Sequence, residues 1–185
     1  MKNGKLIVIS GASGVGKGTV LSLMMQKRDD LFFSVSATTR APRPGEVDGK
    51  HYFFISKECF EEMIKNDEFL EYDAHAANYY GTLRGQAEAK QKKGHVLLDI
   101  EPKGAAQVRK SAPDAILIFI MPPSVEELER RLRGRGDTSE DQIAMRMERA
   151  IWEMEQRTWY DYVVVNDDAQ RCADEILSII SKLED

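Results

Sequence analysis

A glycine-rich stretch at residues 11–18, Gly-Ala-Ser-Gly-Val-Gly-Lys-Gly, most constrains what this chain can fold into. The apolar run Lys5–Ser10 before it is typical of a short buried strand, and residues 19–27 carry apolar side chains at helical spacing without glycine or proline. A strand, a glycine loop and a helix in this order form the context that a phosphate-binding loop requires. The glycines let backbone N–H groups point inward at phosphate oxygens, and the helix N-terminus adds partial positive charge. Lys17 would reach the terminal phosphates as a mobile point charge.

One position of this stretch departs from the common pattern of a phosphate loop. The residue after Lys17 is Gly18, where Ser or Thr usually supplies a hydroxyl to magnesium, and Thr19 follows one position later. The alternative interpretation is an ordinary glycine-rich turn beside an unrelated lysine. Because the required strand and helix flank the loop, the sequence favours phosphate binding.

Composition narrows the class of protein. The 185 residues are 42% hydrophobic and 31% charged, which is typical of one soluble domain with a sizeable core. The net charge of −5 predicts no general attraction to nucleic acid or to an anionic membrane, and no apolar run approaches the ~20 residues of a membrane span. Residues 1–4 lead directly into the first strand, so we expect no signal peptide. Cys59 and Cys172 suggest neither a disulfide framework nor a metal site, so we expect two buried or half-buried thiols in a cytoplasmic protein.

Strand-like and helix-like segments alternate along the chain, which predicts an α/β fold with a mainly parallel sheet. Dense apolar runs of the buried-strand type lie at 95–100, 115–121 and 162–166. Helical patterns lie near 102–111, 124–133, 138–158 and 168–183. Ser124 and Glu127 form the pattern of a capping box at the start of one of these helices.

Residues 34–83 differ from the rest because they are rich in short strands. Strands are expected at 34–39, 51–54 and 69–73, with one helix near 56–66. We interpret this region as a small substrate-binding lobe inserted into the core. Its loop at 40–46 holds two arginines stiffened by two prolines, which suits bidentate recognition of phosphate, although a solvated basic loop is the alternative.

A third region begins at Leu132-Arg-Gly-Arg-Gly136 and continues into a long helix. Arginines cluster before and on this helix, at Arg130, Arg131, Arg133, Arg135, Arg146 and Arg149. Its apolar stripe consists of Ile143, Met147, Ile151 and Met154, which we expect to be core contacts. The glycines flanking Arg135 suggest a hinge, so the region resembles a lid over a transferring phosphoryl group; a charged surface helix is the alternative.

Taken together, these residues resemble the guanylate kinase family over essentially the whole chain. The most specific pattern is Thr38-Thr-Arg-Ala-Pro-Arg-Pro-Gly-Glu46, whereas the glycine loop alone is shared more widely. Further matching stretches are Ser10–Lys17, Ser34–Ala37, Gly49–Phe54, Asn78–Thr82, Leu98–Ile100, Arg131–Gly136 and Val165–Asp168. The resemblance implies a P-loop NTPase-type parallel sheet flanked by helices, with an inserted strand-rich GMP-binding lobe and a helical lid. It also implies phosphorylation of GMP by ATP with Mg²⁺; monomer and homo-oligomer are both compatible with the sequence.

The resemblance further implies a division of the chain and a role for each matching residue. The expected core comprises residues 1–33, 84–126 and 156–185, the nucleoside-monophosphate lobe 34–83 and the lid 127–155. ATP would be bound by Gly11, Ala12, Ser13, Gly14, Val15, Gly16, Lys17, Gly18, Thr19 and Asn166, the last toward the adenine. The transferring group would be surrounded by Lys17, Arg131, Arg135 and Arg146. The GMP phosphate would be held by Arg40, Arg43, Tyr52 and Tyr80, with Glu46 orienting the arginines. Guanine would be read by Ser36, Glu71, Thr82 and Glu101, and Asp99 would lie near the metal and the phosphates.

Two departures and two alternatives accompany this resemblance. The family commonly has Asp-x-Asp followed by Gln-Gly, whereas this chain has Asp99-Ile-Glu101-Pro-Lys-Gly104, so Glu101 carries its carboxylate on a longer arm. Gly18 is the other departure, and we expect magnesium to be held through water, by phosphates and by Asp99. A non-catalytic interaction module of scaffold proteins typically lacks an intact phosphate loop, whereas Lys17 is present here. A ribose bisphosphate kinase would not need the guanine-reading carboxylate of Glu71.

Overall fold

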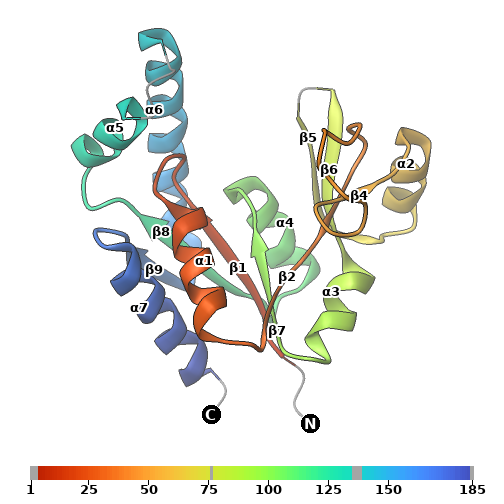
Figure 1. Cartoon of the computed structure of the whole chain (residues 1–185). Helices are drawn as coiled ribbons and strands as arrows, with labels where there is room; N and C mark the ends of the chain where they lie inside the picture. The colour runs from red at the N-terminus through yellow and green to blue at the C-terminus, as the bar shows by residue number, and fades with distance from the viewer. Residues whose placement is uncertain (1–3, 76, 135–138, 184–185) are drawn as a thin grey trace. The chain divides into compact units, whose positions relative to one another are not determined.

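The computed structural model describes residues 4–75, 77–134 and 139–183. Its strands are β1 (Leu6–Gly11), β2 (Leu31–Phe33), β3 (Ser36–Thr38), β4 (Phe53–Phe54), β5 (Phe69–His75), β6 (Asn78–Leu83), β7 (His95–Asp99), β8 (Ile116–Met121) and β9 (Tyr162–Val165). Its helices are α1 (Lys17–Lys27), α2 (Lys57–Lys65), α3 (Arg84–Gln91), α4 (Pro102–Ser111), α5 (Val125–Arg133), α6 (Glu140–Glu155), the short 3-10 helix η1 (Gln156–Trp159) and α7 (Ala169–Lys182). Figure 1 labels most of these elements.

The predicted α/β class is confirmed. The strands form a five-stranded sheet in the order β2-β7-β1-β8-β9 and a four-stranded sheet in the order β4-β3-β6-β5. In the larger sheet β2 pairs with β7 and β8 pairs with β9, both in parallel. The chain divides into two compact units, Met1–Val8 with Asp30–Ile116, and Ile9–Asp29 with Leu117–Asp185.

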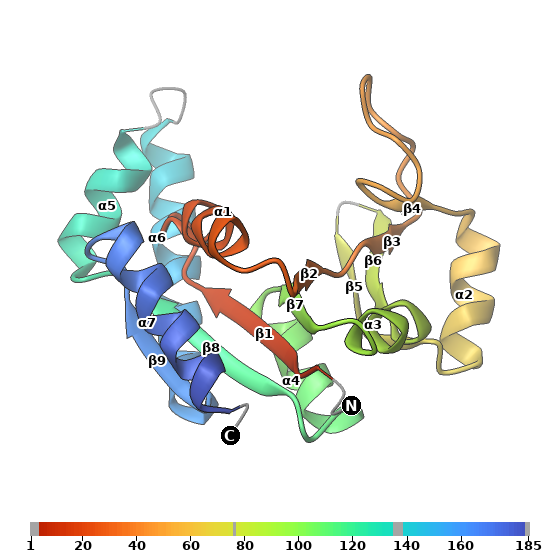
Figure 2. The same ribbon diagram turned by 60° about the horizontal axis from the view of Figure 1, so that its bottom comes forward.

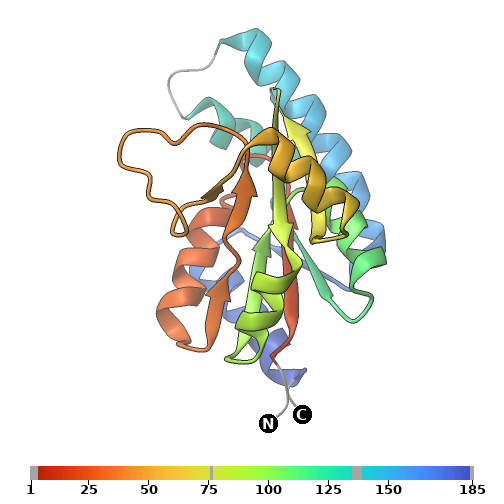
Figure 3. The ribbon, with the colours of Figure 1, turned by 90° about the vertical axis from the view of Figure 1, so that its right-hand side faces the viewer.

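The first unit holds the four-stranded sheet. The pairs β3·β6 and β5·β6 are antiparallel, and β3 pairs with β4 in parallel. One face of this sheet is apolar and packs against α2. Phe60 of α2 stacks on Phe69 and Tyr79 of the sheet, with ring centroids 4.2 and 5.1 Å apart. Helix α2 lies across this face (Figure 3). Ser56 caps α2 by accepting a hydrogen bond from the Cys59 amide.

The second unit is built around β8. Its central residues Leu117–Ile120 are fully buried, and the Phe119 ring meets Tyr160 edge-on at a centroid distance of 5.0 Å. Helices α1 and α7 pack against each other, and Lys27 forms an ion pair with Asp174 between them. Helix α7 also packs on β9 (Figure 2).

Several elements differ from those expected. The elements β2, β6 and α3 have no counterpart among the predicted segments: β2 is only three residues long, β6 contains Gly81, and α3 has Gly85 in its first turn. Cys172 is buried as expected, but Cys59 is exposed, because it lies on the outer side of α2.

Two expectations about the helices after β8 are only partly correct. Ser124 accepts from the Glu127 amide as a capping box requires, but the Glu127 carboxylate binds arginines instead of completing the box. In the apolar stripe of α6, Ile143 and Met154 are buried, whereas Ile151 is 43% exposed. The buried positions of that turn are instead taken by Ala150 and Glu153.

Candidate functional site

The glycine loop has the backbone that its sequence predicts. It runs from the end of β1 at Gly11 to the start of α1 at Lys17. Gly14 and Gly16 have φ of 87° and 91°, in the left-handed region that other residues rarely adopt. Gly16 is the N-cap of α1, so the loop ends directly at the N-terminus of this helix, where backbone N–H groups have no partner within the helix. The loop therefore has the left-handed glycines and the adjoining helix N-terminus that the sequence predicts.

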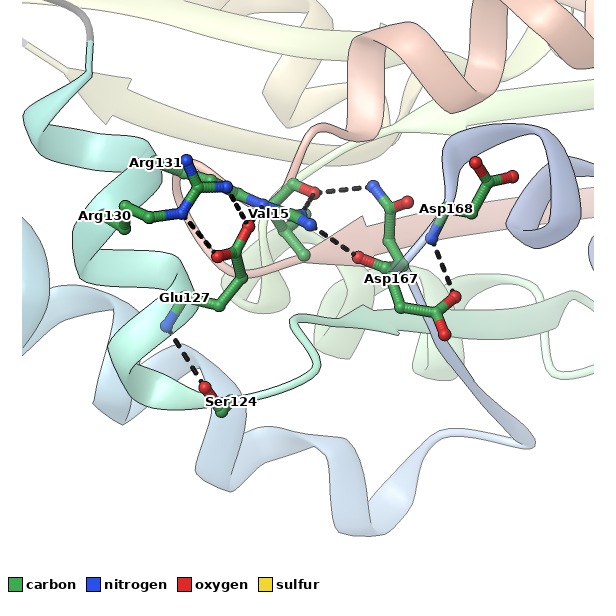
Figure 4. A network of polar contacts seen from close by, with 8 residues as sticks. Val15, Ser124, Glu127, Arg130, Arg131, Asp167 and Asp168 are labelled. Carbon is green, nitrogen blue, oxygen red and sulfur yellow. Dashed lines mark hydrogen bonds and ion pairs between the residues drawn. The ribbon is translucent and has the colours of Figure 1, made fainter.

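Helix α5 holds the outside of this loop. The Val15 carbonyl oxygen accepts from Arg131 Nη1 at 3.1 Å and from Asn166 Nδ2 at 2.7 Å, while Arg131 Nη2 donates to the Asn166 carbonyl at 3.1 Å (Figure 4). Glu127 accepts from Arg131 Nε at 2.8 Å and also binds Arg130. Arg130 and Arg131 together lower the pKa of Glu127 to about 2. The Arg131 guanidinium is thereby fixed beside the loop.

Helix α6 contributes a buried carboxylate to the same loop. The Ser13 amide donates to Glu153 Oε2 at 2.7 Å, and Glu153 Oε1 accepts from Arg149 Nε at 3.1 Å. The Glu153 residue is only 3% exposed. A buried carboxylate is tolerated when both oxygens are paired, as here. The only signal for it in the sequence is the four-residue spacing of Arg149 and Glu153, which many surface helices share.

The other residues expected to bind ATP or to surround the transferring group differ in how exposed they are. Lys17 is half-buried at the first residue of α1, and Gly18 and Thr19 are exposed. A Cβ built on Gly18 would meet no atom within 4 Å among the described residues, so the missing hydroxyl does not reflect a lack of space. Arg146 is exposed on α6, and Arg135 lies outside the described residues.

Arg40 and Glu46 organise a second polar cluster, in the first unit. Glu46 Oε1 accepts from Arg40 Nη2 at 2.8 Å, and Glu46 Oε2 accepts from the Arg43 amide at 2.6 Å. The bond to Arg40, followed by that to Arg43, lowers the pKa of Glu46 to about 2. The Arg40 guanidinium lies 5.5 Å from the Tyr52 ring centroid, and the Tyr52 and Tyr80 rings meet edge-on at 6.1 Å. Arg40, Tyr52 and Tyr80, which the family resemblance groups together, thus lie close to one another.

A polar row crosses the small sheet on the face opposite its apolar cluster. Ser36 pairs with Thr82, and Thr82 pairs with Glu71, so the three residues lie side by side on three strands. Thr82 Oγ1 donates to Glu71 Oε1 at 2.6 Å. Glu71 is 7% exposed, and burial raises the pKa of its carboxyl. A Cβ at Gly104 would lie 2.7 Å from Glu71 Oε2, so this glycine of α4 leaves room for the carboxylate.

A β-bulge determines which face Glu71 occupies. Phe69 pairs with Leu83 and Glu71 pairs with Thr82, so β5 has one extra residue, Leu70, at this point. In a regular strand Phe69 and Glu71 would share a face because side chains alternate. The bulge reverses that alternation, and Phe69 enters the apolar cluster while Glu71 joins the polar row.

Two further carboxylates lie at the start of α4. Asp99 is the last residue of β7, Glu101 is the N-cap of α4, and both are exposed. The charge of Asp73, and then that of Glu101, adds to the upward shift in the pKa of Glu71. The charge of Glu101 therefore acts on the carboxylate with which the family resemblance groups it.

Comparisons with known proteins agree on one family. The sequence model of the family "Guanylate kinase" matches residues 3–183. A guanylate kinase of Trichormus variabilis is 53% identical over 167 residues, covering 90% of this chain and 84% of that protein. One from Streptococcus thermophilus is 51% identical over 181 residues, covering 97% and 87%. The crystal structure of guanylate kinase from Anaplasma phagocytophilum superimposes with a TM-score of 0.73 at 34% identity, covering 98% of this chain and 86% of that one.

Proposed function

This chain belongs to the guanylate kinase family, and we propose how its residues divide the work of the reaction ATP + GMP = ADP + GDP. The enzyme is a nucleoside monophosphate kinase that transfers the γ-phosphoryl group of ATP to GMP. Such a transfer asks for positioning and charge stabilisation more than for covalent chemistry from the protein. The polar clusters of the two units offer both.

The glycine loop is the proposed site of the ATP phosphates. Its N–H groups at the start of α1 would hold phosphate oxygens, and Lys17 would neutralise charge that develops on the β and γ oxygens. Arg131 would stabilise the transferring group, since Glu127 and the Val15 carbonyl already fix its guanidinium. Arg146 and Arg135 remain proposed for the same role. Asn166, whose side-chain amide donates to Val15, would support the loop as well as lie toward the adenine.

The Arg40 cluster is the proposed site of the GMP phosphate. Arg40 and Arg43 would bind its oxygens, with the Tyr52 and Tyr80 hydroxyls as further donors. Glu46 would preorganise this site, because it holds the Arg40 guanidinium and the Arg43 backbone together. The residues 34–83 would then act as the nucleoside-monophosphate lobe and 127–155 as the lid.

The buried Glu71 carboxylate is the observation that most directly supports guanine as the base. Guanine presents two adjacent donors, N1–H and N2–H₂, and a carboxylate accepts from both. Adenine has an acceptor at N1, which would face a buried anion without a proton between them. Ser36, Thr82 and Glu101 would complete the contacts to the base.

Magnesium fits the residues that are present. Mg²⁺ bound with ATP usually takes one or two carboxylates, phosphate oxygens and several waters. Asp99 would provide such a carboxylate, since it is exposed at the end of β7. When bound, Mg²⁺ would supply further neutralisation of the phosphate charge. We also propose a cytoplasmic location, and among the described residues no helix is long and apolar enough to cross a membrane.

A coupled assay of ADP formation tests the proposal. ATP is held at saturation, and GMP, IMP, AMP, CMP and UMP are each varied. The expected order is GMP first, IMP weaker because it lacks the 2-amino group, and AMP, CMP and UMP poor. An enzyme that phosphorylates AMP as well as GMP would contradict base reading by Glu71.

A further inference from the structure

The outer edge of β5 is held by side chains. In the four-stranded sheet β5 is the last strand; it packs against α4, and Arg84 at the start of α3 also reaches it. Arg84 Nη2 donates to the Phe69 carbonyl at 3.2 Å, and Ser111 Oγ donates to the Leu70 carbonyl at 2.7 Å. Gln107 pairs with both backbone groups of Tyr72: its Nε2 donates to the carbonyl at 2.8 Å, and its Oε1 accepts from the amide at 3.1 Å. Gln107 thus imitates a neighbouring strand.

One face of α4 makes these contacts around Glu71. Gly104, Gln107 and Ser111 are spaced three and four residues apart, so they share a side of the helix. Ser111 and Gln107 bind the residues on either side of Glu71, and Gly104 leaves space for its carboxylate. Two side chains of α4 therefore hold the backbone immediately before and immediately after Glu71, the proposed base reader.

These contacts also hold the β-bulge in β5. Leu70 is the extra residue of β5, and its carbonyl is the one that Ser111 binds. A slip of one residue in this strand would exchange the faces of its side chains and turn Glu71 toward the apolar cluster. Because the Gln107 amide matches the outward-facing N–H and C=O of Tyr72, it opposes such a slip.

We propose that Gln107, assisted by Ser111, is a positioning residue for guanine selectivity. It fixes the backbone next to Glu71 and thereby the direction in which the carboxylate meets the base. The inference rests on the proposed function of Glu71 as the base reader. Gln107 is a positioning residue because it acts on the backbone of β5 and not on the nucleotide.

The test compares Gln107→Leu, which removes both bonds at similar volume, with Gln107→Glu, which keeps the acceptor for the Tyr72 amide. Gln86→Leu, at an exposed position on α3, is the matched control. We expect Gln107→Leu to raise the KM for GMP about fivefold or more, as for the loss of neutral hydrogen bonds, with the KM for ATP within about twofold. The ratio of kcat/KM for GMP to that for IMP should fall, because that ratio reports contacts to the 2-amino group. Gln107→Glu places a second acceptor against the Tyr72 carbonyl, so it should also lower this ratio, and the control should match wild type.

The outcomes separate this proposal from the function on which it rests. A Gln107→Leu enzyme with an unchanged ratio of GMP to IMP would overturn the positioning role, as would an equal rise in the KM for ATP. Glu71→Gln is measured alongside: if it changes the ratio while Gln107→Leu does not, only the positioning role fails. If Glu71→Gln leaves the ratio unchanged, base reading by Glu71 and its positioning by Gln107 both fail. Should Gln107→Leu not fold, Ser111→Ala, which removes only the bond to Leu70, must shift the ratio in the same direction or the proposal is wrong.

Discussion

Replacing Glu71 by Gln changes one atom of the proposed base-reading group and leaves its size unchanged. Glu71 Oε1 already accepts from Thr82, and Gln can keep that bond through its single acceptor oxygen. Its NH₂ group then occupies the position of Oε2 and faces the donors of guanine. The variant therefore loses at least one hydrogen bond between the base and a charged group, and it places a donor against a donor.

The magnitude follows from the strength of such a bond. A hydrogen bond to a charged group is worth about 1.5–3 kcal/mol, and about 1.4 kcal/mol corresponds to a factor of ten. We therefore expect the KM for GMP to rise by about tenfold to about a hundredfold, with the KM for ATP little changed. AMP should remain a poor substrate of both enzymes.

The same change should not weaken the fold. Burial raises the pKa of Glu71 in the folded protein, so ionisation of this group costs stability at neutral pH and the cost disappears as pH falls below the pKa of the unfolded chain. Gln carries no charge, and the variant should be at least as stable as wild type at pH 7. The wild-type KM for GMP should also rise as pH falls through the raised pKa, and this dependence should be absent in Glu71→Gln.

Steady-state kinetics with each substrate varied, together with thermal melts, check these expectations. Glu62→Gln, an exposed glutamate on α2, is the matched control and should behave as wild type. An unchanged KM for GMP in Glu71→Gln would refute the assignment of the base reader. A large loss of melting temperature would refute the claim that burial of this charge is unfavourable to the fold.

Three further substitutions test the two proposed phosphate sites. Lys17→Ala should keep the fold, checked by thermal melts, but lower kcat about 10²–10³-fold in the coupled assay, as expected for a lost contact to the transition state; turnover at the wild-type rate would contradict the phosphate-loop interpretation. Glu46→Gln should weaken the hold on Arg40 and raise the KM for GMP several-fold. The ion pair of Glu46 with Arg40 also stabilises the fold above the ordinary carboxyl pKa of 4.5 and is lost as pH falls toward about 2, so acid titrations of the two proteins should differ in that range. Glu153→Met should raise the KM for ATP about tenfold with the KM for GMP unchanged, since it removes the acceptor of a phosphate-loop amide; exposed Glu155→Met is its control, and equal changes for both nucleotides would indicate general damage.

The parts of the fold that the sequence predicts are those set by local chemistry. The glycine loop follows from its own residues, because left-handed backbone at Gly14 and Gly16 needs glycine and the flanking segments are strongly patterned. Helix α4 begins and ends at the predicted residues, with Pro102 at its first turn. The pairing of Arg40 with Glu46, which the family resemblance implies, is also local, since the two residues are six positions apart.

The contacts that sequence reasoning missed join distant parts of the chain. Ser13 and Glu153 are 140 residues apart, and Val15 and Arg131 are 116 apart. In the sequence, Glu153 cannot be distinguished from the exposed charged residues of the same helix, and it is the packing of α6 that buries it. Its pairing with a loop amide therefore depends on tertiary structure that no local pattern encodes.

The face of Glu71 illustrates a different limit. Regular alternation correctly puts Tyr72 on the face opposite Glu71, yet it also puts Phe69 on the same face as Glu71, which the structure contradicts. The extra residue Leu70 is apolar and buried, and the run Phe69-Leu-Glu-Tyr72 carries no glycine or proline to mark an irregularity. What stabilises the bulge is a set of side chains on α4, about forty residues later in the chain at Gln107 and Ser111. A bulge that is stabilised by side chains of another element cannot be recognised from the sequence of its own strand. The omission matters here because the bulge sets the face of Glu71, the residue proposed to read the base.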